Sequence, residues 1–113
     1  MEQINAEALK AVAAYFQVLS EPTRLQVLNL LRTQERNVGE LASLCGFTAA
    51  NISRHLALMT QQGFVVRESR GTSVYYRIAD ESIYALCDLV CGNIGRQLAR
   101  SAGSRAAFMV STP

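Results

Sequence analysis

Residues 37–63 contain two helical segments separated by a glycine turn, and this stretch constrains the fold more than any other. Asn37 followed by Glu40 is a capping-box pattern that opens a short helix, VGELASLC, and Gly46 stands where the C-cap of that helix is expected. Thr48 is then a suitable N-cap for a second helix, AANISRHLALMTQQG. A short helix, a turn containing glycine and a second helix together indicate a helix-turn-helix.

The second of these helices has the pattern of a recognition helix. Ile52, Leu56 and Met59 recur at helical spacing and form its apolar stripe. The polar residues near its start lie where base edges would be met in a major groove about 12 Å wide. The residues of this helix that we expect to contact DNA are Thr48, Asn51, Ser53, Arg54 and His55. Arg54 favours a phosphate contact, since phosphates receive half or more of such bonds, whereas His55 fits a structural role as well as a base contact.

A β-hairpin is predicted directly after the recognition helix. Two short alternating runs, FVVRES and SVYYRIA, are joined by Arg70-Gly71-Thr72, and Gly71 supplies the turn. This position makes the motif winged, and Arg70 at the tip can reach a phosphate or the minor groove. Residues 48–79 hold four arginines against Glu68 alone, a local net charge of +3 in a chain of net charge +2. That concentration points to a polyanion surface, although a solvated face would give the same count.

The remaining segments are predicted to be helical. Periodicity indicates a helix over residues 6–19 and a largely buried helix after it, with Ser20 as N-cap and Pro22 in the first turn. Asp80 is expected to cap a long last helix over about residues 81–101. The order is four helices, a hairpin and a helix (α-α-α-α-β-β-α), which is a mainly α fold with a small hairpin.

The length of 113 residues fits one domain. We expect a single winged-helix DNA-binding domain over residues 1–113, with an ordered core over about residues 6–101 and a loose tail over residues 102–113. No apolar run approaches the roughly 20 residues needed to span a bilayer, and the N-terminus lacks the pattern of a signal peptide. Three cysteines, an odd count, argue against a disulfide framework. We therefore expect a cytoplasmic protein with reduced thiols and no membrane partner.

Three stretches together resemble one known family. VLSEPTRLQVLNLL, NVGELASLCGFTAANISRHLALMTQQGFV and RGTSVYYRIAD are similar to the arsenic-repressor (ArsR/SmtB) family of winged-helix regulators over roughly residues 10–100. The resemblance implies a bacterial repressor that is a homodimer, with the first and last helices at the dimer interface. It also implies release from double-stranded operator DNA when an inducer binds. The two-fold symmetry of such a dimer selects an inverted repeat in the operator.

One departure from the family bears on operator recognition. Many members carry Ser-Gln at the start of the recognition helix, where this chain has Thr48-Ala49. A bidentate glutamine contact to adenine is therefore missing, and the operator sequence cannot be borrowed from relatives.

Two cysteines of the last predicted helix form a candidate binding site. Cys87 and Cys91 are four residues apart, so they share one helical face, with Cβ atoms roughly 5–6 Å apart. On the resemblance, this face would meet the partner subunit. Converging thiolates can hold a soft ion, with As(III) or Sb(III) favoured and Cd(II), Pb(II) or Hg(II) as alternatives. A disulfide within one helix fits poorly because the Cβ vectors are parallel, and simple interface packing is the plain alternative.

Cys45 is the third cysteine, and its expected role is packing. The cysteine motif that arsenic sensors carry before the recognition helix is only partly present, because ELASLCG has a single cysteine. A thiolate from Cys45 would complete a trigonal metalloid site only if it approached the last helix. The zinc-type variant of the family uses carboxylate and histidine ligands on the last helix, and this chain has no histidine after His55. Zinc, nickel and cobalt are therefore disfavoured.

The leading interpretation is a DNA-binding repressor released by a thiophilic metalloid or metal, with no cofactor needed for DNA binding. One rival keeps the DNA-binding part and makes the thiols a redox or persulfide sensor. A more distant rival is a winged-helix module that serves protein interaction without an effector. An enzyme is disfavoured, since the only histidine lies in the recognition helix and no phosphate-cradling glycine loop stands out.

Overall fold

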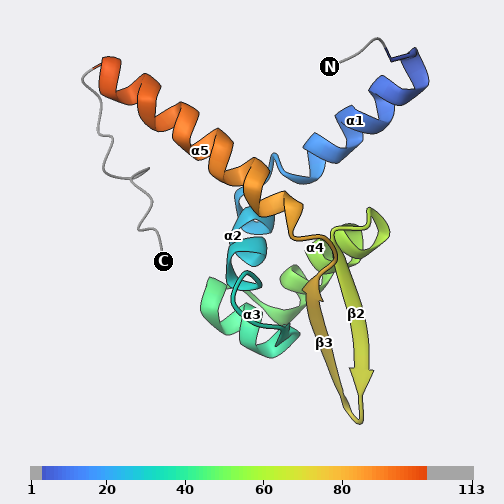
Figure 1. Cartoon of the computed structure of the whole chain (residues 1–113). Helices are drawn as coiled ribbons and strands as arrows, with labels where there is room; N and C mark the ends of the chain where they lie inside the picture. The colour runs from blue at the N-terminus through green and yellow to red at the C-terminus, as the bar shows by residue number, and fades with distance from the viewer. Residues whose placement is uncertain (1–3, 102–113) are drawn as a thin grey trace. The chain divides into compact units, whose positions relative to one another are not determined.

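The computed structural model describes residues 4–101 of the chain (Figure 1). The predicted loose tail over residues 102–113 lies outside the described residues. The chain divides into two compact units, the first ending at Ala79 and the second beginning at Asp80. The organisation of residues 1–113 as a single domain stays a prediction.

The first unit contains the helix-turn-helix and the hairpin. Its elements are α1 (Ala6–Val18), α2 (Pro22–Leu30), β1 (Arg36–Asn37), α3 (Val38–Cys45), α4 (Ala49–Gln61), β2 (Val65–Arg70) and β3 (Ser73–Ile78). The second unit contains α5 (Ser82–Arg100). The predicted order of four helices, a hairpin and a helix is confirmed, with the short strand β1 as an addition.

The predicted N-cap of α2 is wrong by one residue. The carboxylate of Glu21 accepts the backbone N–H of Arg24 at 3.0 Å and caps the helix, with Pro22 at the first helical position. The hydroxyl of Ser20 instead donates to the carbonyl of Gln17 at 2.7 Å, at the end of α1. Ser20 therefore closes the preceding helix rather than opening the next one.

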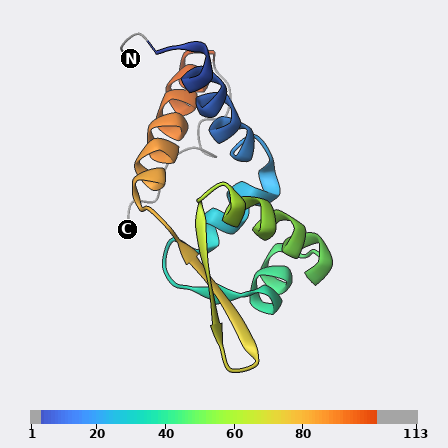
Figure 2. The same ribbon diagram turned by 90° about the vertical axis from the view of Figure 1, so that its right-hand side faces the viewer.

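The sheet has three strands rather than the two predicted. Their order is β1-β3-β2, and both pairs are antiparallel. The register places Tyr76 of β3 between Arg36 of β1 and Arg67 of β2. Gly71 forms the hairpin turn with φ of 61°, a value that favours glycine. The far end of the β2–β3 hairpin extends beyond α3 and α4, as both views show (Figures 1 and 2).

A single apolar core holds α2, α3, α4 and the base of the hairpin. Its side chains include Val27, Leu28, Leu31, Leu41, Ile52, Leu56, Met59, Phe64, Val65 and Tyr76. The predicted stripe of α4 is confirmed, since Ile52, Leu56 and Met59 are completely buried. The expectation of a largely buried α2 holds for only part of that helix, because Leu25 is 40% exposed.

Helix α5 makes up the described part of the second unit. Its first backbone N–H groups find one side-chain acceptor, the carboxylate of Asp80, which accepts the N–H of Ser82 at 2.9 Å. Asp80 therefore bonds the helix start as predicted, although Glu81 occupies the N-cap position. Hydrogen bonds from Ser82 lower the pKa of the Asp80 carboxyl. Within residues 4–101, neither this helix nor any other combines the length and the apolar character that crossing a bilayer requires.

Candidate nucleic-acid interface and thiol pair

The turn before α4 is held by the cap that ends α3 and by the cap that begins α4. Gly46 adopts φ of 72° at the end of α3, as the sequence predicted. The Asn37–Glu40 capping box at the other end of α3 is also present. The hydroxyl of Thr48 accepts the backbone N–H of Asn51 at 3.1 Å and caps α4. With its apolar stripe in the core, α4 presents its opposite face to solvent.

The solvent-facing residues of α4 include Ser53 and Arg54, which are both exposed. Arg54 forms no ion pair within residues 4–101. Its guanidinium is therefore a cation without a compensating carboxylate in the part of the chain that the structure describes.

Asn51 lies at the edge of this face, and one side of its amide is buried. The Oδ1 atom has no hydrogen-bond partner and is shielded from solvent. A bidentate contact to adenine needs both amide heavy atoms at the surface. Exchanging the oxygen and nitrogen positions would still leave one of them buried. Asn51 can therefore offer DNA at most one hydrogen-bonding atom in this conformation.

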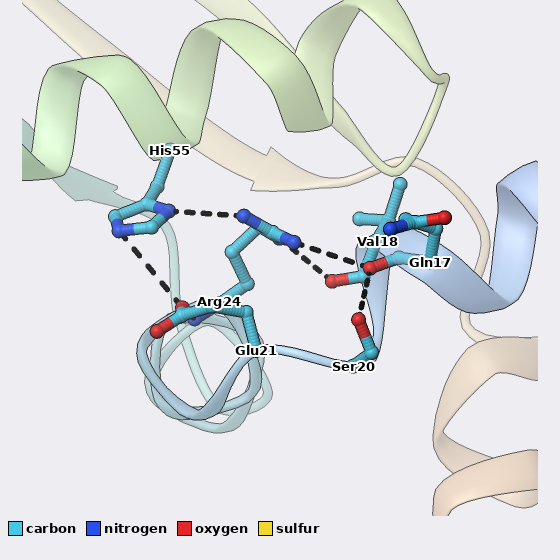
Figure 3. A network of polar contacts seen from close by, with 6 residues as sticks. All are labelled: Gln17, Val18, Ser20, Glu21, Arg24 and His55. Atoms are coloured by element: carbon cyan, nitrogen blue, oxygen red, sulfur yellow. Dashed lines mark hydrogen bonds and ion pairs between the residues drawn. The ribbon is translucent and has the colours of Figure 1, made fainter.

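His55 lies on the side of α4 that faces α2, where Arg24 joins three elements (Figure 3). The Arg24 guanidinium donates to the carbonyls of Val18 at 2.7 Å and Gln17 at 3.1 Å, at the end of α1. Its Nη1 lies 3.3 Å from Nδ1 of His55. Nε2 of His55 lies 3.9 Å from a carboxylate oxygen of Glu21. The network thus connects the end of α1, the start of α2 and the recognition helix.

The chemistry of arginine fixes how the imidazole is used in this network. Arginine can only donate, so Nδ1 of His55 accepts and the ring proton of the neutral form lies on Nε2, toward Glu21. Desolvation raises the pKa of the Glu21 carboxyl, but the hydrogen bond from the Arg24 backbone N–H, the electrostatic effect of the neighbouring His55 and hydrogen bonds from Thr23 outweigh it, so the pKa is lowered overall. Both ring nitrogens are therefore directed at α2 rather than at the outer face of α4, an arrangement suited to the structural role considered for His55.

The wing-tip arginine is paired with two carboxylates. Nη2 of Arg70 lies 2.8 Å from Oε2 of Glu35 and 2.8 Å from Oε1 of Glu68, and its Nη1 also donates to Glu35. The guanidinium carbon sits 5.0 Å from the ring centroid of Tyr75. The Arg70 hydrogen bond lowers the pKa of Glu35, and the carboxylates raise the pKa of Arg70. The charge expected to be open at the tip is therefore compensated within the protein.

Sequence reasoning missed two features of the wing. Glu35 lies 35 residues from Arg70 in the chain, and no local pattern connects them. Arg67 is exposed on β2 and forms no ion pair within the described residues. Strand alternation could have separated it from Arg70, because residues an odd number apart point to opposite faces of a strand.

The thiols of Cys87 and Cys91 lie one turn apart on α5, and both are half-buried. None of the three cysteines forms a disulfide. Cys45, at the end of α3, is also half-buried rather than fully enclosed, and burial raises the pKa of its thiol. Among residues 4–101, no three or more histidine, cysteine or acidic side chains gather as a metal-binding group. Among the described residues, no third such side chain gathers with the two thiols on α5.

Comparison with known proteins agrees with this architecture. Residues 21–66 match the family described as bacterial regulatory protein, arsR family. The transcriptional regulator KmtR of Mycobacterium tuberculosis (strain ATCC 25618 / H37Rv) is 36% identical over 75 residues, which cover 66% of this chain and 58% of KmtR. The crystal structure of M. tuberculosis Rv0081 aligns with a TM-score of 0.80 at 29% identity, covering 88% of this chain and all of that one.

A second solved structure has a more explicit description. It is the homodimeric winged helix-turn-helix DNA-binding domain of Mb0332 from Mycobacterium bovis, a possible ArsR-family regulator. It aligns with a TM-score of 0.75 at 33% identity and covers 87% of this chain and 93% of that fragment.

The fold and these similarities define a winged helix-turn-helix transcriptional regulator and not an enzyme. The chain belongs to the arsR family of bacterial regulatory proteins, which confirms the resemblance seen in the sequence.

Proposed function

We propose that this protein is a transcriptional repressor that binds an inverted-repeat operator as a homodimer and leaves it when a thiophilic metalloid or metal binds. The DNA-facing part of the proposal rests on the exposed face of α4. Ser53 and Arg54, in the first turns of α4, would enter the major groove, while Thr48 and Asn51 lie at the start of the helix. His55 would act by holding α4 in place through Arg24.

Exposed apolar side chains support the dimer. Leu9 and Phe16 on α1, and Leu89 and Val90 on α5, are all exposed in the single chain. Large apolar groups left in solvent on two helices are typical of surfaces that a partner covers. A homodimer through α1 and α5 would cover them, and its symmetry would match the inverted repeat. We place the protein in the bacterial cytoplasm.

The observation that carries the inducer proposal is the pair Cys87 and Cys91, one helical turn apart and outside any disulfide. Thiolates select soft ions over oxygen-loving ones, so As(III) or Sb(III) is favoured, with Cd(II), Pb(II) or Hg(II) as further candidates. The pair supplies two of the three ligands of a trigonal metalloid site. The third would come from the partner subunit or from a small thiol in solution.

The incomplete ligand set also favours a second candidate. Without a third convergent ligand among the described residues, Cys87 and Cys91 have what a thiol sensor needs, namely two neighbouring sulfurs. Oxidation or transfer of sulfane sulfur from a polysulfide would modify these thiols without any metal. In that case the same helix would change shape or packing and release the DNA.

A DNA-release assay tests the inducer proposal. Operator-bound protein is exposed to As(III), Sb(III), Cd(II), Pb(II), Hg(II) and Zn(II), and the apparent affinity is measured for the parent, Cys87→Ser and Cys91→Ser. Cys45→Ser serves as the matched thiol control. A typical allosteric coupling predicts that the inducer lowers the parent affinity roughly 5–150-fold. The two α5 variants should stay bound, and Cys45→Ser should be released like the parent.

Two results would contradict this proposal. Normal release of both α5 variants by all of the soft ions would make the pair simple packing. Loss of release in Cys45→Ser, with full stability, would make Cys45 a ligand. Mass spectrometry of the released protein separates the two candidate functions, since bound arsenic or antimony supports the first and added oxygen or sulfur supports the second.

A further inference from the structure

The two faces of the wing differ in the ion pairs that their arginines form within the protein. On β2, the side chains of Val65 and Arg67 lie on the same face of the sheet as Tyr76, which pairs with Arg67 on β3. Val65 and Tyr76 are buried, and α3 and α4 contact the hairpin strands. We call this the helix-side face. Arg67 is exposed on it, next to the buried base of the hairpin.

The opposite face, here the outer face, carries Glu68, Arg70, Tyr75 and Arg77. Arg70 on this face is paired with both Glu35 and Glu68. Arg77 is exposed and forms no ion pair within residues 4–101. The arginine at the wing tip is therefore already compensated within the protein.

The helix-side face has no such compensation among residues 4–101. Across the sheet, the row that contains Arg67 continues through Tyr76 to Arg36 of β1. Arg36 donates from Nε to the carbonyl of Leu30 at 2.9 Å. This hydrogen bond fixes the guanidinium without neutralising its charge. Neither arginine of this row forms an ion pair in the described part of the chain.

We propose that Arg67 makes the phosphate contact of the wing, and that Arg70 instead braces the hairpin against the segment before β1. This assignment rests on the proposed DNA binding. A phosphate gains most from a cation that no carboxylate already satisfies. Arg67 meets that condition on the side of the wing that α4 shares, and Arg70 does not.

Displacement of Glu35 and Glu68 by DNA would gain little. A phosphate would replace one anion by another at Arg70, so that the cations released from the DNA would be offset by cations drawn to the two freed carboxylates. It would also leave two carboxylates without a partner close to the negatively charged backbone. Arg67 has no such competitor to remove.

Salt dependence distinguishes the two arginines. Affinity for a labelled mixed-sequence duplex, long enough for two half-sites, is measured from about 50 to 200 mM salt for the parent, Arg67→Ala and Arg70→Ala. Each phosphate contact contributes about 0.9 to the slope of log K against log salt, so removing one such interaction from each subunit reduces the slope by about 1.8. The advantage of the parent over Arg67→Ala should then shrink about 12-fold across this range. Arg70→Ala should keep the parent slope.

Two further variants guard against a merely structural effect. Arg67→Lys keeps the charge and should restore the slope. Glu35→Gln should leave the slope unchanged, because Arg70 makes no phosphate contact that the loss of the Glu35 charge could strengthen. An unchanged slope in Arg67→Ala, or a steeper slope and tighter binding in Glu35→Gln, would overturn the assignment while leaving the proposed function in place. Failure of the folded parent to bind any duplex would overturn both.

Discussion

The recognition helix and the wing each contain one polar side chain that is bonded within the protein and one arginine that has no ion pair in the described part of the chain. In α4, His55 turns inward to Arg24 and Glu21, and Arg54 is left exposed without a carboxylate within the described residues. In the wing, Arg70 is held by carboxylates, and Arg67 is left exposed. Each region therefore has one polar side chain used by the protein itself and a neighbour left open.

The difference lies in what the inward side chain does. The contact of His55 lies at the meeting point of three helices, where Arg24 donates to two carbonyls that end α1. The contact of Arg70 is mainly a surface ion pair, and such pairs contribute little to stability. The network at α4 should therefore matter for the fold, whereas the one at the wing should matter mostly for the position of the hairpin.

The largest expected effect comes from removing Arg24. Arg24→Met leaves a partly buried carbonyl at Val18 without its charged donor and releases His55, which should cost about 2 kcal/mol of unfolding free energy. Urea denaturation measures the change. Arg54→Ala is the matched control, and an exposed unpaired arginine should alter stability by no more than about 0.5 kcal/mol. If Arg24→Met and Arg54→Ala were equally stable, the network around Arg24 would contribute no more to the fold than the exposed Arg54.

Local patterns predicted the elements of the first unit well. The Asn37–Glu40 capping box, the Gly46 and Gly71 turns and the Thr48 cap all depend on residues within a few positions of one another, and all are present. The strand β1 was missed because two residues are too few to show alternation. It exists because β3 offers it a pairing edge.

The partners of the candidate DNA-binding residues were beyond the reach of the sequence. His55 and Arg24 are 31 residues apart, and Arg70 and Glu35 are 35 apart. Periodicity identifies which face of an element is polar, but it cannot reveal which polar side chain meets a partner from a distant segment. The choice between His55 and Arg54, and between Arg70 and Arg67, therefore required the three-dimensional structure.

A smaller effect is expected from pH at the wing. The Arg70 hydrogen bond holds the pKa of Glu35 below its ordinary value, against an opposing effect of burial. The pair therefore adds stability above the pKa of the unfolded chain and loses it as pH falls through the lowered pKa of the folded state. Urea midpoints of the parent and Glu35→Gln should differ at neutral pH and converge in acid. A gap that persists unchanged into acid would show that the ionised pair is not its source.

We expect the open arginines Arg54 and Arg67, and not the paired arginines Arg24 and Arg70, to meet DNA. Side-chain NMR of the Nε–H groups tests it in one experiment, with the parent protein and a mixed-sequence duplex added stepwise. We expect the signals of Arg54 and Arg67 to shift as DNA is added, while those of Arg24 and Arg70 keep their positions. A shift of the Arg70 signal with Arg67 unmoved would contradict it.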